Sequence, residues 1–151
     1  MKSCAFFGHG DLNYREHQKE IENSIVDLIE NYQVGQFYTG GRGAFDNFCA
    51  QQVARLKGKY PHIKNTLVLS YRPKNGWILS KIYDDSIYLL EENVPPKYAI
   101  SRTNKILVEK VDFVITAVWK SWGGARVAHD YAERRGKIFK NIFDKRNGER
   151  A

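Results

Sequence analysis

The sequence predicts an α/β fold, a mainly parallel β-sheet with helices on both faces, and two observations support it. Short apolar runs rich in β-branched and aromatic residues alternate with longer stretches whose apolar residues recur at helical spacing. Several of these runs end in glycine just before a helical stretch, as strand-to-helix turns do. Strands that alternate with helices pair in parallel and leave the helices on the two faces of the sheet. At 151 residues, the chain is predicted to form one domain over 1–142, followed by a basic, polar tail at 143–151.

The first half of the chain contains three predicted strands and two predicted helices. They are, in order, a strand at 3–8, a helix ending at Tyr32, a strand at 35–41, a helix at 45–56 and a strand at 65–71. The strands are short apolar runs such as "SCAFFG". Asn13, with Glu16 three residues later, resembles a capping box ahead of the first helix. In the second helix, Phe45, Cys49 and Val53 recur at the spacing that places them on one face.

The second half contains two further helices and two further strands. They are a helix at 98–110, a strand at 111–118, a helix from Gly124 to Arg135 and a strand at 137–142. The run "VDFVITAV" at 111–118 is almost continuously apolar and β-branched, which is typical of a strand buried on both faces. The segment 78–97 is left open, with "DSIYLL" as a candidate for a short additional strand and "VPP" as a break.

Short connections and right-handed crossovers limit the order of these strands in the sheet. With the five strands numbered along the chain, the simplest order is 3-2-1-4-5, which is Rossmann-like. In such sheets ligands bind at the carboxyl ends of the strands, where the strand order reverses. The reversal is predicted between the strand at 3–8 and the strand at 111–118.

Three predicted strand-to-helix turns would meet at that edge, and all three contain glycine. They are Gly8-His9-Gly10, then Gly40-Gly41-Arg42-Gly43 followed by Asp46, and Lys120-Ser121-Trp122-Gly123-Gly124. Glycine lets backbone amides approach a ligand closely, and a helix N-terminus adds roughly half a positive charge. The turns therefore predict an anion site, although glycine is also common in tight turns without a ligand. None of them is a dinucleotide-binding or Walker A fingerprint.

The net charge of +7 is distributed unevenly along the chain. Residues 1–32 hold three basic and six acidic side chains, whereas residues 133–150 hold seven basic and three acidic ones. A basic surplus suits a phosphorylated ligand or a nucleic acid, and it also occurs on ordinary solvated surfaces. DNA binding is not favoured here, because aromatic residues do not alternate with the basic ones in 133–150 and no helix-turn-helix pattern is present.

The sequence also indicates a cytoplasmic protein without a membrane segment. The longest apolar run, "VDFVITAVW", is short and contains Asp112. The N-terminal apolar run is too short for a secretory signal. The two cysteines, Cys4 and Cys49, are predicted to be buried and reduced. The scattered histidines and cysteines predict no metal site, and no cofactor is expected.

Four stretches of the chain carry a resemblance to a known family. "CAFFGHG", "YTGGRGAFD", "YAISRTNKILVEKVDFVI" and "SWGGARVAHDYAERRGK" resemble the SLOG superfamily, and within it the YpsA-like branch of uncharacterised bacterial and phage proteins. The resemblance covers most of residues 3–142. It implies a Rossmann-like fold that binds nucleotides or nucleotide-derived molecules. The superfamily includes LOG phosphoribohydrolases, DNA-binding DprA proteins and sensor domains for NAD-derived signals.

The resemblance assigns ligand-site candidates to the glycine turns and to one helix. They are Gly8, His9, Gly40, Gly41, Gly43, Asp46, Arg102, Asn104, Gly123 and Gly124. The LOG enzymes have a threonine after their glycine turn and a glutamate three residues beyond it. Ala125 and Ala128 stand at those places here, so the fold and the pocket are expected to transfer better than the reaction.

The chemistry of individual residues adds roles to these candidates. Arg42 is suited to pairing with a phosphate, and Asp46 to accepting from ribose hydroxyls or complementing a helix dipole. Arg102 is favoured over Asn104 as the residue that reaches the ligand, since residues two apart on a helix face different directions. Trp122 is suited to stacking on a base, and equally to covering the core or a subunit contact. His9 could contact the ligand or bond to the backbone of its turn.

Three functions are consistent with these features. The favoured one is a sensor or sequestering module that binds a small nucleotide-like ligand, such as an ADP-ribose or NAD derivative, at the glycine turns. The first alternative is a hydrolase or transferase acting on the N-glycosidic bond of a nucleoside or nucleotide, with Asp46 and Asp130 as the catalytic candidates. The second alternative is DNA binding. Pairing of two or more copies through helices beside the pocket is a further expectation.

Overall fold

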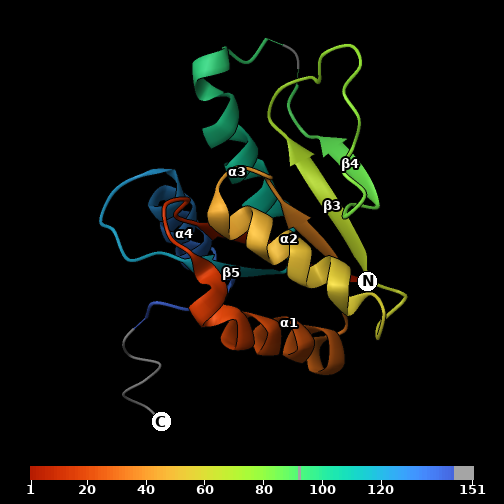
Figure 1. Cartoon of the computed structure of the whole chain (residues 1–151). Helices are drawn as coiled ribbons and strands as arrows, with labels where there is room; N and C mark the ends of the chain where they lie inside the picture. The colour runs from red at the N-terminus through yellow and green to blue at the C-terminus, as the bar shows by residue number, and fades with distance from the viewer. Residues whose placement is uncertain (92, 145–151) are drawn as a thin grey trace.

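The computed structural model describes residues 1–91 and 93–144, and within them six parallel strands form one sheet (Figure 1). The strands are β1 (Lys2–Gly8), β2 (Val34–Thr39), β3 (Lys64–Leu69), β4 (Asp85–Tyr88), β5 (Phe113–Ala117) and β6 (Ile138–Asn141). Their order across the sheet is β4-β3-β2-β1-β5-β6. The predicted α/β class and the predicted order of five strands are confirmed. The stretch "DSIYLL" supplies the additional edge strand β4 beside β3.

Two helices cover each face of the sheet. Helices α1 (Gln18–Tyr32) and α2 (Ala44–Leu56) lie on one face, and α3 (Ala99–Lys110) and α4 (Gly124–Arg134) lie on the other (Figure 1). Short 3₁₀ turns at Tyr14–His17 and Pro96–Tyr98 precede α1 and α3. Asn13 caps the first of these turns rather than α1 itself, because its side chain accepts from the backbone N–H of Arg15 at 3.1 Å.

Several predicted boundaries shift by a residue or two. The second strand ends at Thr39, so Gly40 and Gly41 belong to the turn that follows it. The strand predicted at 111–118 is shorter, because Asp112 lies before it and its carboxylate accepts from the backbone N–H of Ser3 at 2.9 Å. The predicted basic tail falls mostly at 145–151, outside the described residues.

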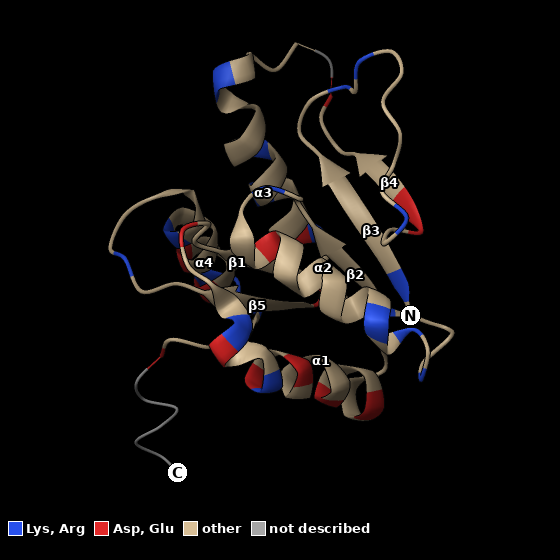
Figure 2. Ribbon diagram, viewed as in Figure 1, with Lys and Arg blue, Asp and Glu red and all other residues tan. Residues whose placement is uncertain are grey.

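Charge is uneven over the surface, as the sequence indicates. Figure 2 colours the ribbon by residue type and shows several acidic residues along α1 and basic residues on the loop between β3 and β4. No helix in the described ranges combines the length and the apolar character that crossing a bilayer requires.

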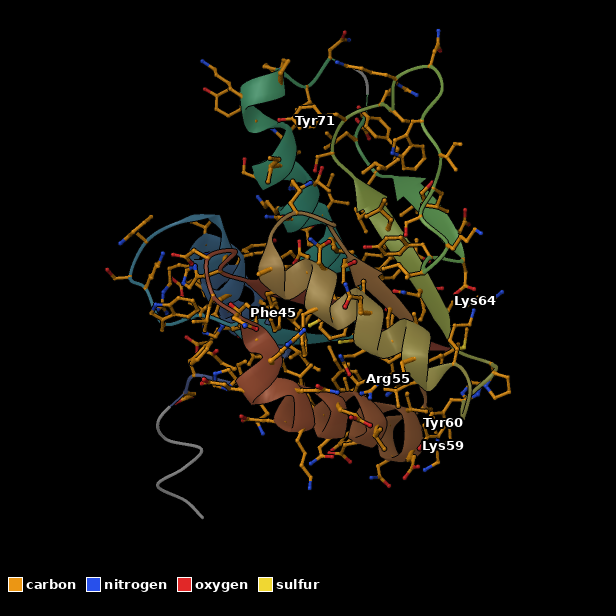
Figure 3. The ribbon with its side chains drawn as sticks, in the orientation of Figure 1. Phe45, Arg55, Lys59, Tyr60, Lys64 and Tyr71 are labelled. Atoms are coloured by element: carbon orange, nitrogen blue, oxygen red, sulfur yellow. The ribbon has the colours of Figure 1, made fainter. Side chains whose placement is uncertain are left out.

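The amino and carboxyl ends of the parallel strands lie at opposite edges of the sheet and carry different residues. Figure 3 places Tyr71, which follows β3, at one end of the molecule, and Lys59, Tyr60 and Lys64, which precede or begin β3, at the other. Because all strands run in the same direction, the turns after β1, β2 and β5 lie at the end marked by Tyr71.

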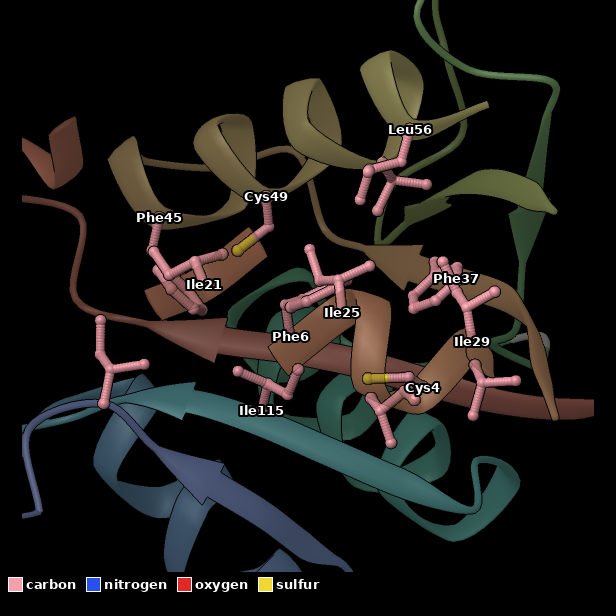
Figure 4. Close-up of a cluster of buried hydrophobic side chains, with 14 of the residues drawn as sticks. Cys4, Phe6, Ile21, Ile25, Ile29, Phe37, Phe45, Cys49, Leu56 and Ile115 are labelled. Carbon is pink, nitrogen blue, oxygen red and sulfur yellow. The ribbon is translucent and has the colours of Figure 1, made fainter. Parts of the chain in front are cut away.

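The core has two layers because successive side chains of a strand point to opposite faces. Cys4 and Phe6 of β1 join the cluster under α1 and α2, which Figure 4 shows. Ala5 and Phe7 join the cluster under α3 and α4. Strand β5 is likewise buried on both faces, as predicted. Cys4 and Cys49 are free thiols with no exposed surface, both within the first cluster.

Candidate functional site

The glycine turns converge on one pocket at the carboxyl edge of the sheet. The pocket has a volume of about 140 Å³. The predicted residues that line it are Gly8 at the end of β1, Gly40, Arg42 and Asp46 around the β2–α2 turn, Asn104 on α3 and Gly124 at the start of α4. Four separate segments of the chain therefore contribute to one site, as the predicted strand order requires.

The turns after β1 and β2 touch through their backbones. A Cβ added to Gly43 would lie 2.9 Å from the Cα of Gly10, which is too close, and Gly43 has a φ of +92°. The N–H of Ala44 donates to the carbonyl of Gly10 at 3.4 Å. These glycines therefore hold the turn after β1 against the turn after β2, next to the pocket-lining residues Gly8 and Arg42.

Gly8 and Gly124 line the same pocket for different reasons. A Cβ on Gly8 would lie 2.4 Å from the ring of Phe45, so Gly8 is required by the packing of β1 against α2. A Cβ on Gly124 would meet no atom within 4 Å. No steric contact in the described structure therefore explains the glycine at position 124.

The N-terminus of α4 is open toward solvent. Its N-cap residue is Gly123, with a φ of +101°, and no side chain caps the helix. Among the described residues, none accepts a hydrogen bond from the backbone N–H groups of Gly124 or Ala125. Both residues line the pocket. Unpaired amides at a helix N-terminus are a favourable place for an anion.

Asp46 is a buried carboxyl group in the first turn of α2. Only 9% of its surface is exposed, and one oxygen accepts from the backbone N–H of Arg42 at 3.3 Å. Burial raises the pKa of Asp46 to about 7, against the opposing effects of the hydrogen bond and charge of Arg42. A carboxyl group with a raised pKa in a cleft is a frequent feature of functional sites.

Arg42 joins the pocket to the next strand. Its guanidinium donates from Nη1 to the Oγ of Ser70 at 3.1 Å, and Ser70 directly follows β3. The rest of the residue is exposed. Arg42 therefore presents a positive charge between the turn after β2 and the turn after β3.

His9 has a positioning role in this structure. Its backbone N–H donates to Ala117, and its Nε2 accepts from the N–H of Lys120 at 3.2 Å. The ring also meets Trp119 edge-on, with centroids 4.5 Å apart. Burial, followed by the nearby charge of Lys120, lowers the pKa of His9, so the neutral ring is the favoured form. The bond between the His9 ring and the backbone of Lys120 holds the β5–α4 loop against β1, and contact of His9 with a ligand stays a prediction.

Three other predicted residues lie away from the pocket. Arg102 lines a different opening, of about 780 Å³, that is bounded by 89–91 and 93–95, and so Asn104 rather than Arg102 faces the glycine turns. Trp122 is 67% exposed, with the Nζ of Lys120 4.8 Å from its ring centre. Asp130 pairs with Arg126 at 3.5 Å on α4 and does not join Asp46 at the pocket. The two catalytic candidates are thus not assembled into one site.

Two openings adjoin the glycine-lined pocket. One, of about 250 Å³ between α3 and α4, shares Ile100, Asn104 and Gly124 with it. The other, of about 330 Å³, runs along the loop after β3 and shares Gly40 and Arg42. None of the functions predicted from the sequence assigns a role to that loop. Its signal is the alternation of aromatic and basic residues in "SYRPKNGW" at 70–77, which the basic segment 133–150 lacks.

The fold is shared with solved proteins of low sequence identity. DNA processing protein A from Streptococcus pneumoniae superposes with a TM-score of 0.66 at 19% identity, over 95% of this chain and 52% of that one. The Helicobacter pylori protein of the same name, solved for its single-stranded DNA binding mode, gives 0.63 at 12% identity, over 92% and 64% of the two chains. The molybdenum cofactor carrier protein of Chlamydomonas reinhardtii gives 0.55 at 15% identity, over 92% and 75%.

These comparisons show the fold alone. The chain has the Rossmann-like α/β fold of these solved proteins. It spans about half to two thirds of the length of the two DNA processing proteins. No protein-family model matches the sequence, and no curated protein matches it either.

Proposed function

We propose that the chain binds the phosphate-bearing part of a nucleotide or nucleotide-derived ligand in the glycine-lined pocket, as a sensor or sequestering module of the YpsA-like type. The observation that carries the proposal is the start of α4. Gly124 occupies a place where no packing requires glycine, and its free N–H lies beside that of Ala125 in a pocket that also contains Arg42. A phosphate explains all three features together.

Each lining residue has a chemical task in this proposal. The amides at the start of α4 donate to phosphate oxygens, and the helix adds roughly half a positive charge. The guanidinium of Arg42 offers paired donors to the same group. Asp46 accepts from ribose hydroxyls, and the amide of Asn104 both donates and accepts.

The size of the pocket limits what it holds. Its volume of about 140 Å³ is below the roughly 300–1,000 Å³ of most small-molecule sites. In this proposal the phosphate occupies the pocket, and the sugar and the remainder of the ligand extend from it toward an adjoining opening. Among the similar solved proteins, the Helicobacter pylori protein binds single-stranded DNA and the Chlamydomonas reinhardtii protein carries the molybdenum cofactor. Both are consistent with ligand binding by this fold.

Calorimetric titration with AMP, NAD, ADP-ribose and cyclic ADP-ribose tests the proposal. We expect at least one of them to bind, and Gly124→Ala to weaken binding tenfold or more without loss of folding, because the added methyl would stand in the lining of the pocket but meets no protein atom. Gly58→Ala is the matched control: its Cβ would make only an ordinary contact of 3.6 Å with the carbonyl of Arg55, on the connection that leads into β3. Silence across the panel, or equal effects of the two variants, contradicts the proposal.

A second candidate, cleavage of an N-glycosidic bond, draws support from Asp46 alone. With a pKa of about 7, this carboxyl group is partly protonated near neutral pH and could serve as a general acid. Release of free base from nucleotides, lost in Asp46→Asn, is the expected result for this candidate. Binding without base release leaves the sensor proposal in place and removes the hydrolase.

A further inference from the structure

The loop between β3 and β4 carries an exposed set of aromatic and basic side chains. Tyr71 and Trp77 are 49% and 42% exposed. From Ser70 to Tyr83 the loop contains Arg72, Lys74 and Lys81 and no acidic residue. No ion pair engages these three cations within the described residues. Exposed aromatic rings beside unpaired cations are the composition of a surface that binds phosphates and flat rings.

The loop is held in place at three points. The hydroxyl of Tyr71 donates to the carbonyl of Pro96 at 3.0 Å, which ties the loop to the segment before α3. The guanidinium of Arg72 lies 4.7 Å from the ring centre of Tyr88 on β4. At the tip, the N–H of Trp77 donates to Lys74 at 3.1 Å across a turn in which Gly76 has a φ of +84°. A loop ordered in this way loses less entropy when it binds a ligand.

The loop opening is continuous with the glycine-lined pocket. Gly40 and Arg42 line both, and Arg42 reaches Ser70 at the root of the loop. A ligand that leaves the pocket past Arg42 therefore enters an opening lined by Tyr71, Arg72, Lys74 and Trp77. Figure 3 shows Tyr71 at this end of the molecule, between the loop and α3.

We propose that this loop is a second subsite, which takes the next ring and the next phosphate of a ligand whose first phosphate occupies the glycine-lined pocket. The ligand class is a nucleotide chain with at least two phosphates, either a free dinucleotide or a single-stranded oligonucleotide. Trp77 stacks on a ring, and Arg72 and Lys74 contact the second phosphate. This inference rests on the proposed function and extends it to a longer ligand.

Binding of AMP, NAD and 5′-phosphorylated deoxythymidine oligonucleotides of one, two, four and eight residues tests the subsite by fluorescence titration. We expect affinity to rise about tenfold from one nucleotide to two, the size of one stacked base. Trp77→Ala and Lys74→Ala should remove that rise and leave AMP affinity unchanged. Lys74→Ala should also lower the slope of log K against log salt by about 0.7, the value for one phosphate contact on a single strand. Lys59→Ala, an exposed lysine at the opposite edge of the sheet, is the control and should change nothing.

The outcomes separate the two proposals and the two ligand sources. An increase in affinity shared by NAD and the two-residue oligonucleotide supports a free dinucleotide as the ligand. An increase in affinity that continues up to eight residues supports a single-stranded oligonucleotide. If AMP binds but no length dependence is found, the loop subsite is overturned and the glycine-lined pocket stands. If oligonucleotide binding is lost in Trp77→Ala but unaffected by Gly124→Ala, the loop binds alone and the proposed continuity is overturned.

Discussion

At the scale of single residues, Asp46 is an ionisable carboxyl group that is buried in the folded protein. An aspartate free in solution has a pKa near 3.8, and burial raises that of Asp46 to about 7. The folded state therefore binds this proton more tightly than the unfolded state, and the free energy of unfolding falls as pH rises from about 4 to about 7. A loss of stability caused by ionisation of a side chain that lines a pocket is typical of residues that act in binding or catalysis.

Asp46→Asn should therefore stabilise the protein at alkaline pH. We expect a gain of up to roughly 4 kcal/mol at pH 8 in urea unfolding, because burial raises the pKa of the Asp46 carboxyl from 3.8 to about 7, and little gain at pH 4, where the aspartate is already neutral. Glu16→Gln, at an exposed position, serves as the control and should give no such difference between the two pH values. Equal stabilities of Asp46→Asn and the unmutated protein at pH 8 would show that the carboxylate is not buried as described.

His9 should titrate below the ordinary range of histidine. Burial and the charge of Lys120 disfavour its protonated form, so its pKa is lowered, and its contribution to stability is complete above about 6.5 and is lost as pH falls. Nuclear magnetic resonance of the imidazole should show a midpoint below 6.5, with the Nε2 unprotonated at neutral pH. The backbone N–H of Lys120 should shift in the same titration, because it loses its acceptor. A midpoint above 6.5 would contradict this description of His9.

Gly8→Ala should destabilise the fold, in contrast to Gly124→Ala. The new methyl would lie 2.4 Å from the ring of Phe45, and the strand and helix that carry these residues cannot easily separate. We expect a loss of about 1–3 kcal/mol in the free energy of unfolding, measured in urea. The sequence could predict that both glycines lie near the site, but not which of them packing requires, because that depends on a ring 37 positions away in the chain.

At the scale of elements, the amide of Asn141 extends the pairing of β5 and β6. It accepts from the N–H of Val118 and donates to its carbonyl, both at 3.0 Å, one residue beyond the end of β5. Asn141→Ala should lower the free energy of unfolding by about 1–3 kcal/mol and speed hydrogen exchange at Val118. Asn31→Ala, on the exposed side of α1, should do neither. Unchanged exchange at Val118 would refute this role.

Elements were predictable wherever a local pattern decides them. Among the described residues, apolar runs and helical spacing located the four α-helices and five of the six strands, and the candidate "DSIYLL" supplies the sixth, β4. The choice between Arg102 and Asn104 was not predictable in this way, because it depends on the rotation of α3 about its axis, which tertiary packing sets. The predicted topology placed Asp130 near the pocket, but in the structure Asp130 does not line it and pairs with Arg126 on α4.

At the scale of the whole molecule, topology creates the site. Parallel strands in the order β4-β3-β2-β1-β5-β6 bring the turns after β1, β2 and β5 to one edge, although these turns are far apart in the chain. That convergence followed from the strand order alone and was predictable. A binding role for the β3–β4 loop was not predicted, because that role depends on Arg42 bridging to Ser70, a contact between residues 28 positions apart.

The most direct test of the account is a map of backbone amide chemical shifts during titration with AMP. If the glycine turns form one anion site, the largest changes should fall at Gly40, Arg42, Gly124 and Ala125, with little change at Lys59 and Lys64 on the opposite edge. Changes confined to a single turn, or centred on the opposite edge, would contradict the central claim that separate turns bind one ligand together.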